Sequence, residues 1–199
     1  MTPSPATDDF PRLVQELTER LAARPARDVE PDGRLPAGVL VPLFPDPPHR
    51  IATLLTLRTQ TVRDHKGQVS FPGGVREERD ADLLATALRE AEEEIGVPPS
   101  AVRVVGRLDD CPTLTGYVIR PFVGLLRERP AVRASPVEIE RVFTVPLSEL
   151  SRSGACRFER VETGGWTVES YVFEVDGQVV WGATARMLVD LIDRLGPLA

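Results

Sequence analysis

The sequence contains few cysteines and histidines, two of each among its 199 residues. Cys111 and Cys156 stand far apart in the chain, with no Cys-x-x-Cys pair. This usage argues against a disulfide framework and against a cysteine-based metal site. Packing is the favoured interpretation of both cysteines, and Cys111 is the better candidate for a neighbour of a functional site.

Long apolar runs are absent too. No stretch approaches the roughly 20 residues of a membrane span, and the polar, acidic start MTPSPATDDF does not resemble a signal peptide. The final residues Gly196–Ala199 are not a peroxisomal signal. We therefore expect a cytoplasmic protein that does not bind membranes.

Basic residues are outnumbered, with 24 Lys and Arg against 30 Asp and Glu, which gives a net charge of −6 and a pI near 5.1. This balance argues against a nucleic-acid surface, which needs a basic patch. It does not exclude an anionic substrate, because a bound metal can supply local positive charge. Lys66 is the only lysine, and such a preference for arginine is typical of a GC-rich bacterial genome.

The hydrophobic content of 42% suffices for one good core. Residues 1–9 are polar and expected to be disordered, and we divide the chain into a tail with a short amphipathic helix (1–35) and a main domain (36–199). The spacing of apolar residues predicts helices at 11–23, from about 80–82 to 96, and at 183–195, and strands at 37–43, 51–57, 102–108, 118–126, 141–145, 167–175 and 179–181. The first two strands are consistent with a hairpin. The order predicts an α+β fold, an α/β/α sandwich with a central mixed sheet flanked by helices.

The most informative stretch runs from residue 71 to 97 and combines a glycine turn with an acidic helix. At about 100° per residue, Glu90, Glu93 and Glu94 fall within roughly 100° of one another around the helix. Such like charges repel, so the cluster indicates either a solvated face or a bound cation. Hard oxygen ligands suit Mg²⁺ or Mn²⁺, and the turn Pro72-Gly73-Gly74 lets the backbone approach a ligand closely.

The same helix has an apolar side and recognisable ends. Acids at 80–82 suit its beginning, and Gly96 followed by two prolines suits its end. Leu84, Leu88, Ala91 and Ile95 are spaced to face a core on the side opposite the three glutamates.

Two linked motifs resemble a known family. The segment 89–97, REAEEEIGV, matches the second half of the Nudix box, RE-U-x-EE-x-G-U with U apolar, and the chain thus resembles the Nudix hydrolase superfamily. Residues 54–74, LLTLRTQTVRDHKGQVSFPGG, resemble the signature LLTxR[SA]xxxRxxxGxxxFPGG of the coenzyme A pyrophosphatase subfamily. Thr59 departs from that signature. The loop after Gly74 is one residue longer than in the general box and carries Asp80 in place of glutamate, which leaves the role of Asp80 open.

The resemblance implies a Nudix fold and a metal-dependent pyrophosphohydrolase that uses Mg²⁺ or Mn²⁺. By this resemblance Glu90 and Glu94 are the principal metal ligands, with Glu93 as a third ligand or the base that activates water. Arg89 is assigned to the catalytic set as an organiser that pairs with an acid of the loop 74–82. Glu138 and Glu140 lie in a later segment from which some Nudix enzymes draw a base, and surface charge is their alternative.

The implied substrate is coenzyme A or its derivatives, cleaved to 3′,5′-ADP and 4′-phosphopantetheine. Arg58, Arg63 and Lys66 are candidates to bind its phosphates, although loop cations are often plain surface charge. The backbone of Gly73 and Gly74 could face the metal or a phosphate. A stacking role for Trp181 competes with a place in the core.

Two other functions stay open at this point. The chain could hydrolyse another nucleoside diphosphate derivative, such as ADP-ribose, NADH or a nucleotide sugar, or it could sense a nucleotide without cleaving it. Its expected partner is in each case a small molecule. A homodimer could form through the apolar side of the N-terminal helix.

Overall fold

The computed structural model describes residues 10–59, 67–163 and 165–196. Every helix and strand that the sequence predicts is present, with ends that differ by one or two residues. The elements are α1 (Phe10–Ala22), β1 (Leu35–Pro45), β2 (Ile51–Arg58), β3 (Val69–Ser70), β4 (Gly73–Val75), α2 (Leu83–Ile95), η1 (Pro99–Ala101), β5 (Arg103–Arg107), β6 (Cys111–Pro112), β7 (Tyr117–Leu125), β8 (Ile139–Pro146), α3 (Leu147–Leu150), β9 (Cys156–Thr163), β10 (Trp166–Val175), β11 (Gln178–Trp181) and α4 (Gly182–Leu195). The segment 1–9, expected to be disordered, lies outside the described residues.

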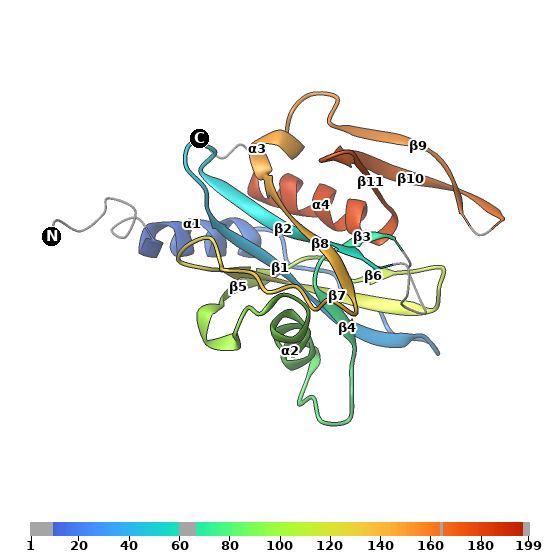
Figure 1. The fold of residues 1–199 in the computed structure, drawn as a ribbon, viewed down its shortest axis with the longest axis horizontal. Coiled ribbons are helices and arrows are strands. Elements are labelled where there is room, and N and C mark those ends of the chain that lie inside the picture. Colours follow the sequence, from blue (N-terminus) through green and yellow to red (C-terminus); the bar gives the residue numbers. More distant parts are fainter. Residues whose placement is uncertain (1–9, 60–66, 164, 197–199) are drawn as a thin grey trace, which may run out of the picture.

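The central sheet is mixed, as predicted. Its main path runs β3-β2-β1-β7-β5, and β4, β6 and β8 pair with β1, β7 and β2 respectively. β1 and β2 form the predicted antiparallel hairpin, whereas β1 pairs in parallel with the whole of β7. The sheet lies between α2 on one face and α1 and α4 on the other (Figure 1). This arrangement is the α/β/α sandwich expected from the sequence.

β1 is buried on both faces because it lies in the middle of the sheet. Val39, Val41 and Leu43 point toward the large core that α1 and α4 cover. Leu40 points the other way and packs with Ala87 of α2. The near-continuous apolar sequence of this strand follows from its two covered faces.

The first and last helices lie against each other. Leu17 of α1 and Leu191 of α4 are fully buried in the same core. Arg20 of α1 donates a hydrogen bond to the carbonyl of Leu195, and Arg24 pairs with Asp190 of α4. We considered the apolar side of α1 as a possible dimer contact. In the structure this side packs into the protein's own core. A homodimer would need another surface.

The C-terminal strands form a sheet of their own. β9, β10 and β11 pair in the order β11-β10-β9, separate from the central sheet, and α4 packs against β10. The sequence does not predict β9, because half of its residues CRFERVET are charged, most are exposed, and the apolar alternation does not continue along the strand. No helix among the described residues is long and apolar enough to cross a membrane.

Candidate active site

The acidic helix α2 begins and ends where the sequence predicts. Asp82 caps its first turn by accepting a hydrogen bond from the backbone N–H of Ala85, 2.8 Å away. Gly96 ends it in the left-handed conformation, with φ of 73°. The two caps therefore define where α2 begins and ends.

Two glycines let α2 lie unusually close to the strands. A Cβ on Gly38 of β1 would lie 2.1 Å from the carbonyl oxygen of Leu83, at the first residue of α2. A Cβ on Gly74 of β4 would lie 2.4 Å from Oε1 of Glu90. A side chain at Gly38 would clash with the backbone of α2, and one at Gly74 would push the Glu90 carboxylate away from the glycine turn.

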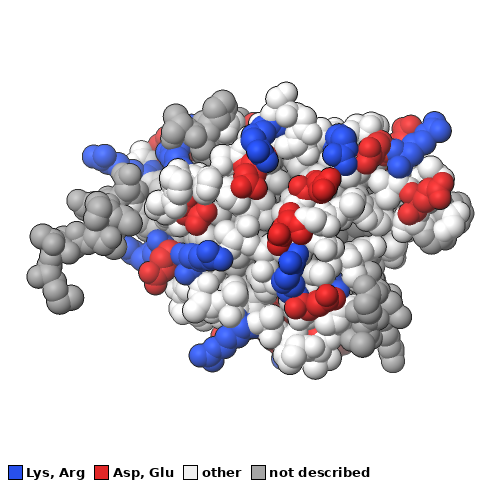
Figure 2. Space-filling model, turned by 45° about the horizontal axis from the view of Figure 1, so that its top comes forward, with Lys and Arg blue, Asp and Glu red and all other residues white. Residues whose placement is uncertain are grey.

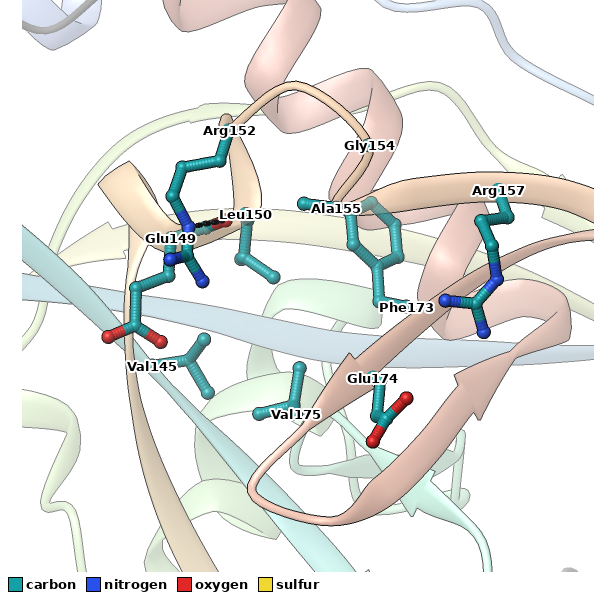
Figure 3. A pocket seen from close by; sticks show the side chains of 10 residues that line it. All are labelled: Val145, Glu149, Leu150, Arg152, Gly154, Ala155, Arg157, Phe173, Glu174 and Val175. Carbon is teal, nitrogen blue, oxygen red and sulfur yellow. Dashed lines mark hydrogen bonds between the residues drawn. The ribbon is translucent and has the colours of Figure 1, made fainter.

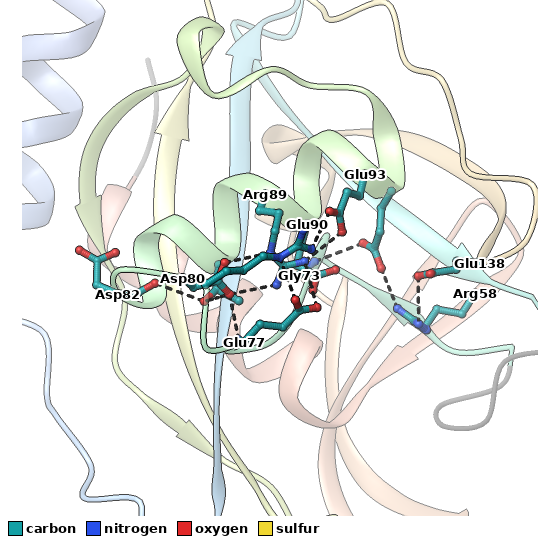
Figure 4. A network of polar contacts seen from close by, with 12 residues as sticks. Arg58, Gly73, Glu77, Asp80, Asp82, Arg89, Glu90, Glu93 and Glu138 are labelled. Carbon is teal, nitrogen blue, oxygen red and sulfur yellow. Dashed lines mark hydrogen bonds and ion pairs between the residues drawn. The ribbon is translucent and has the colours of Figure 1, made fainter.

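Asp80 lies in the loop before α2 and forms a two-pronged ion pair with Arg89. The guanidinium Nε and Nη2 donate to the two carboxylate oxygens over 2.9 and 3.0 Å. Asp80 also accepts from the N–H of Glu77 and the hydroxyl of Thr86, each at 2.9 Å. The bonds from Arg89 hold the pKa of the Asp80 carboxyl far below its usual range. The predicted pairing of Arg89 with an acid of this loop is present, and the acid is Asp80 (Figure 4).

Arg89 also reaches two of the predicted ligands. Its Nη1 lies 2.9 Å from Oε1 of Glu90 and 2.9 Å from Oε2 of Glu93. Glu93 is half exposed and has a second partner in Arg79, at 3.1 Å. Burial raises the pKa of Glu90, although Arg89 opposes the rise. One guanidinium thus gathers the carboxylates that follow it along the helix.

Glu94 is the most buried of the three glutamates, with only 2% of its side chain exposed. Its Oε2 accepts from the N–H of Gly73 at 3.2 Å, and its Oε1 from Nη1 of Arg58 at 2.8 Å. Burial, with further contributions from Glu90 and Glu138, raises the pKa of Glu94 to about 7, although Arg58 and Gly73 favour the charged form. The sequence assigned the glutamates to the side opposite Ile95. Glu94 departs from that pattern, because it is buried together with Ala91 and Ile95.

The oxygen donors of the site have the chemistry that a divalent cation prefers. Across the described parts of the chain, no three His, Cys, Asp or Glu side chains converge closely enough to hold an ion, and Arg58 and Arg89 stand against the carboxylates instead. Burial, with a smaller contribution from neighbouring carboxylates, nevertheless raises the pKa values of Glu90 and Glu94, and both side chains lie next to the Gly73-Gly74 turn. Excess negative charge on hard oxygen atoms is what Mg²⁺ or Mn²⁺ would neutralise.

The other candidates fall into three groups. Arg63, His65 and Lys66 lie outside the described residues. Glu138 comes near the site, with Oε2 3.7 Å from Nη2 of Arg58, whereas Glu140 is exposed within β8.

Trp181 and Cys111, which the sequence analysis also considered, are partly and fully buried respectively. Trp181 is partly buried at the junction of β11 and α4. Cys111 is buried in β6. Sequence reasoning missed Glu77 and Arg79, which complete the ion-pair network around Arg89 and Glu93. The only local signal for them was their place in the lengthened loop.

A small pocket lies elsewhere, between α3 and the strands β9 and β10 (Figure 3). It measures about 150 Å³ and is lined by Phe173 and by charged residues of both signs, among them Glu149 and Arg152. None of the residues predicted for the active site lines it. The face shown in Figure 2 likewise carries interspersed acidic and basic side chains. Mixed charge alone therefore does not distinguish the candidate site, which is marked by its buried ion pairs.

Comparisons with known proteins find relatives in sequence and in fold. A family model described as the NUDIX domain matches residues 34–161. A Nudix hydrolase named NudL from Photorhabdus laumondii is 37% identical over 164 residues, 82% of this chain and 87% of that protein. A NudL protein from Shigella flexneri serotype 5b is 37% identical over 189 residues, 95% of this chain and 94% of the relative. The crystal structure of a MutT/nudix family protein from Enterococcus faecalis has a TM-score of 0.53 at 15% identity and covers 98% of this chain and 75% of that one. The last likeness concerns the fold alone.

Proposed function

This chain belongs to the Nudix family, and from that premise we propose that it is a Mg²⁺- or Mn²⁺-dependent hydrolase of the diphosphate bond in coenzyme A and its derivatives. Residues 36–199 form the hydrolase domain in this proposal. One observation carries the catalytic part. Glu90 and Glu94 lie one helical turn apart beside the Gly73-Gly74 turn, and Glu94 is bonded to the N–H of Gly73.

The reaction is a hydrolysis in which water attacks one phosphorus of the diphosphate. A new P–O bond forms to the water oxygen, and the bridging P–O–P bond breaks to release 3′,5′-ADP and 4′-phosphopantetheine or its acyl derivative. A divalent cation, when bound, neutralises the phosphate oxygens and lowers the pKa of the attacking water. Glu90 and Glu94 would hold it.

The remaining steps belong to side chains of the site. Glu93 either completes the ligand set or takes the proton of the attacking water, a role that its half-exposed carboxylate suits. Arg89 positions Glu90 and Glu93 through its anchor on Asp80. Arg58, at the end of β2, is assigned to a phosphate group of the substrate, and Arg63 and Lys66 keep the same assignment from the sequence.

The choice of coenzyme A rests on the sequence of residues 54–74, in which every fixed position of the subfamily signature except Thr59 is matched. The substitution at Thr59 favours keeping one alternative, a Nudix hydrolase of another nucleoside diphosphate derivative such as ADP-ribose or NADH. Its chemistry at Glu90, Glu93 and Glu94 would be the same.

Product analysis tests both parts of the proposal. The purified protein is incubated separately with coenzyme A, ADP-ribose and NADH, with Mg²⁺, Mn²⁺ or EDTA, and the products are separated by chromatography. We expect metal-dependent release of 3′,5′-ADP from coenzyme A. Cleavage of ADP-ribose or NADH alone would refute the substrate, and the absence of any cleavage would favour a non-catalytic sensor of nucleotides.

A further inference from the structure

Arg58 lies where the proposed metal would bind, and the proposed function does not account for this position. Its guanidinium lies against a buried carboxylate that would have to bind the metal, with Nη1 2.8 Å from Oε1 of Glu94. The arginine side chain is 20% exposed and that of Glu94 2%. Since the N–H of Gly73 engages the other oxygen of Glu94, both carboxylate oxygens have protein partners.

The backbone holds Arg58 at this point from two sides. Its N–H donates to the carbonyl of Gln68 at 3.0 Å, and the next N–H, of Thr59, donates to the carbonyl of Glu138 at 2.8 Å. The register between β2 and β8 shifts between Leu57 and Arg58, which indicates a bulge of the kind that re-aims a side chain. The position of Arg58 is therefore fixed by the fold.

A second carboxylate lies within reach of the same guanidinium. Oε2 of Glu138 is 3.7 Å from Nη2 of Arg58, and the Glu138 side chain is 45% exposed (Figure 4). Arg58 thus has one strong, buried partner and one weaker, partly hydrated partner. The two carboxylates thus face different nitrogen atoms of one guanidinium.

We propose that Arg58 is a built-in counter-cation that occupies Glu94 in the metal-free protein and is displaced by the divalent ion. A buried carboxylate without a positive partner is strongly destabilised, and two cations beside one oxygen repel each other. The arginine and the metal therefore compete for Oε1 of Glu94. Glu138 retains the displaced guanidinium next to the site, where it can meet the diphosphate. This inference rests on the proposed function, because it takes Glu94 as a metal ligand.

The molecule contains a matched pair that should not respond to metal. Arg120 of β7 binds Asp110 with Nε and Nη2 at 2.9 and 2.7 Å, and the Asp110 side chain is 1% exposed. Asp110 also accepts from the N–H of Val29 in the N-terminal connector. This pair resembles the first in composition and burial, so Arg120→Gln controls for the general cost of breaking a buried ion pair.

The test measures Mn²⁺ binding by calorimetry and melting temperature in EDTA and in saturating Mn²⁺, without substrate, on the full chain. We expect Arg58→Gln to bind Mn²⁺ at least about 10-fold more tightly, within the usual range of coupling between two sites. Its melting temperature should fall in EDTA and recover in Mn²⁺. Arg120→Gln should lower the melting temperature equally in both buffers and leave the Mn²⁺ affinity unchanged.

A second variant covers the case in which Arg58→Gln does not fold. Arg58→Lys keeps a charge but loses the planar fork, so we expect an Mn²⁺ affinity between those of the wild type and Arg58→Gln. Unchanged or weaker Mn²⁺ binding in both variants would overturn the inference, and so would a wild-type protein that binds no Mn²⁺. A wild type that hydrolyses coenzyme A while the variants gain no affinity refutes the inference alone. Tighter binding without any hydrolysis refutes the proposed function alone.

Discussion

The loop before α2 and the last turn of that helix each hold a carboxylate that pairs with an arginine, and the two pairs are built differently. Asp80 accepts four hydrogen bonds, two of them from Arg89, and its pKa is held far below the usual range. Glu94 accepts one bond from Gly73 and one from Arg58, and its pKa is raised to about 7, chiefly by burial. The first pair is saturated, whereas the second leaves its charge partly uncompensated.

The difference in hydrogen bonding suits the two carboxylates to different roles, a structural one for Asp80 and metal binding for Glu94. A carboxylate whose oxygens are fully engaged by the protein gains little from a new ligand, because it must first lose its bonds. A buried carboxylate with few bonds gains a great deal from a cation. Asp80 therefore fixes the loop and Arg89, and Glu94 is the group that can exchange its partner. In the structure the contact of Asp80 that the sequence left open is with Arg89.

Replacing Glu94 by glutamine should produce the largest functional effect. The amide keeps the size of the side chain and can still accept the N–H of Gly73, but it provides no charge for a metal. We expect turnover to fall by about 10²–10³-fold, the scale of removing a key electrostatic group, while the melting temperature in EDTA changes little. Wild-type turnover in this variant would mean that Glu94, like Asp80, has only a structural role.

Glu93→Gln should lower turnover by at least about 10²-fold for the same reason. The half-exposed position of Glu93 predicts that the fold stays intact, and circular dichroism checks this point. The matched control is Glu92→Gln, since Glu92 is exposed on the same helix and has no assigned role. Near-normal turnover of the Glu93 variant would remove that residue from the catalytic set.

Asp80→Asn should act first on stability. Breaking one side of a buried, hydrogen-bonded ion pair costs about 3 kcal/mol or more, and Arg89 would lose its anchor. We expect this loss in urea unfolding to be present already in EDTA, without any metal. A loss that appeared only with Mn²⁺ would mean that Asp80 belongs with Glu94 as a ligand.

Acid should weaken the contribution of Asp80 and provides the finest test of the comparison. Because its folded pKa is lowered, this carboxylate stabilises the fold above the ordinary aspartate pKa of about 4, and the stabilisation is lost as the pH falls further. The difference in unfolding free energy between wild type and Asp80→Asn should therefore shrink from pH 7 to pH 3. A constant difference over that range would contradict the lowered pKa.

Much of the fold could be predicted because its signals are local. The ends of α2 follow from Asp82 and Gly96, and the hairpin of β1 and β2 follows from two apolar runs around a proline-rich loop. β9 gives no such signal, because its charged residues are satisfied by solvent and by its pairing with β10. Its assignment depends on a partner strand and not on its own pattern.

The site was predictable in composition but not in pairing. The identity and spacing of the glutamates follow from the sequence, as does an acidic partner for Arg89 within a nearby loop. The pair of Arg58 and Glu94 joins residues 36 positions apart. The spacing of apolar residues within each element does not predict that the end of β2 meets the last turn of α2. For the same reason the helical pattern assigned Glu94 to the solvent side, where it would have needed no arginine.

The contact between the first and last helices has a consequence for how the chain is made. α1 leaves the ribosome early, yet Arg20 and Arg24 find their partners on α4, at Leu195 and Asp190. The core that α1 covers also includes Leu191. The native surroundings of α1 therefore form only when α4 has packed against it.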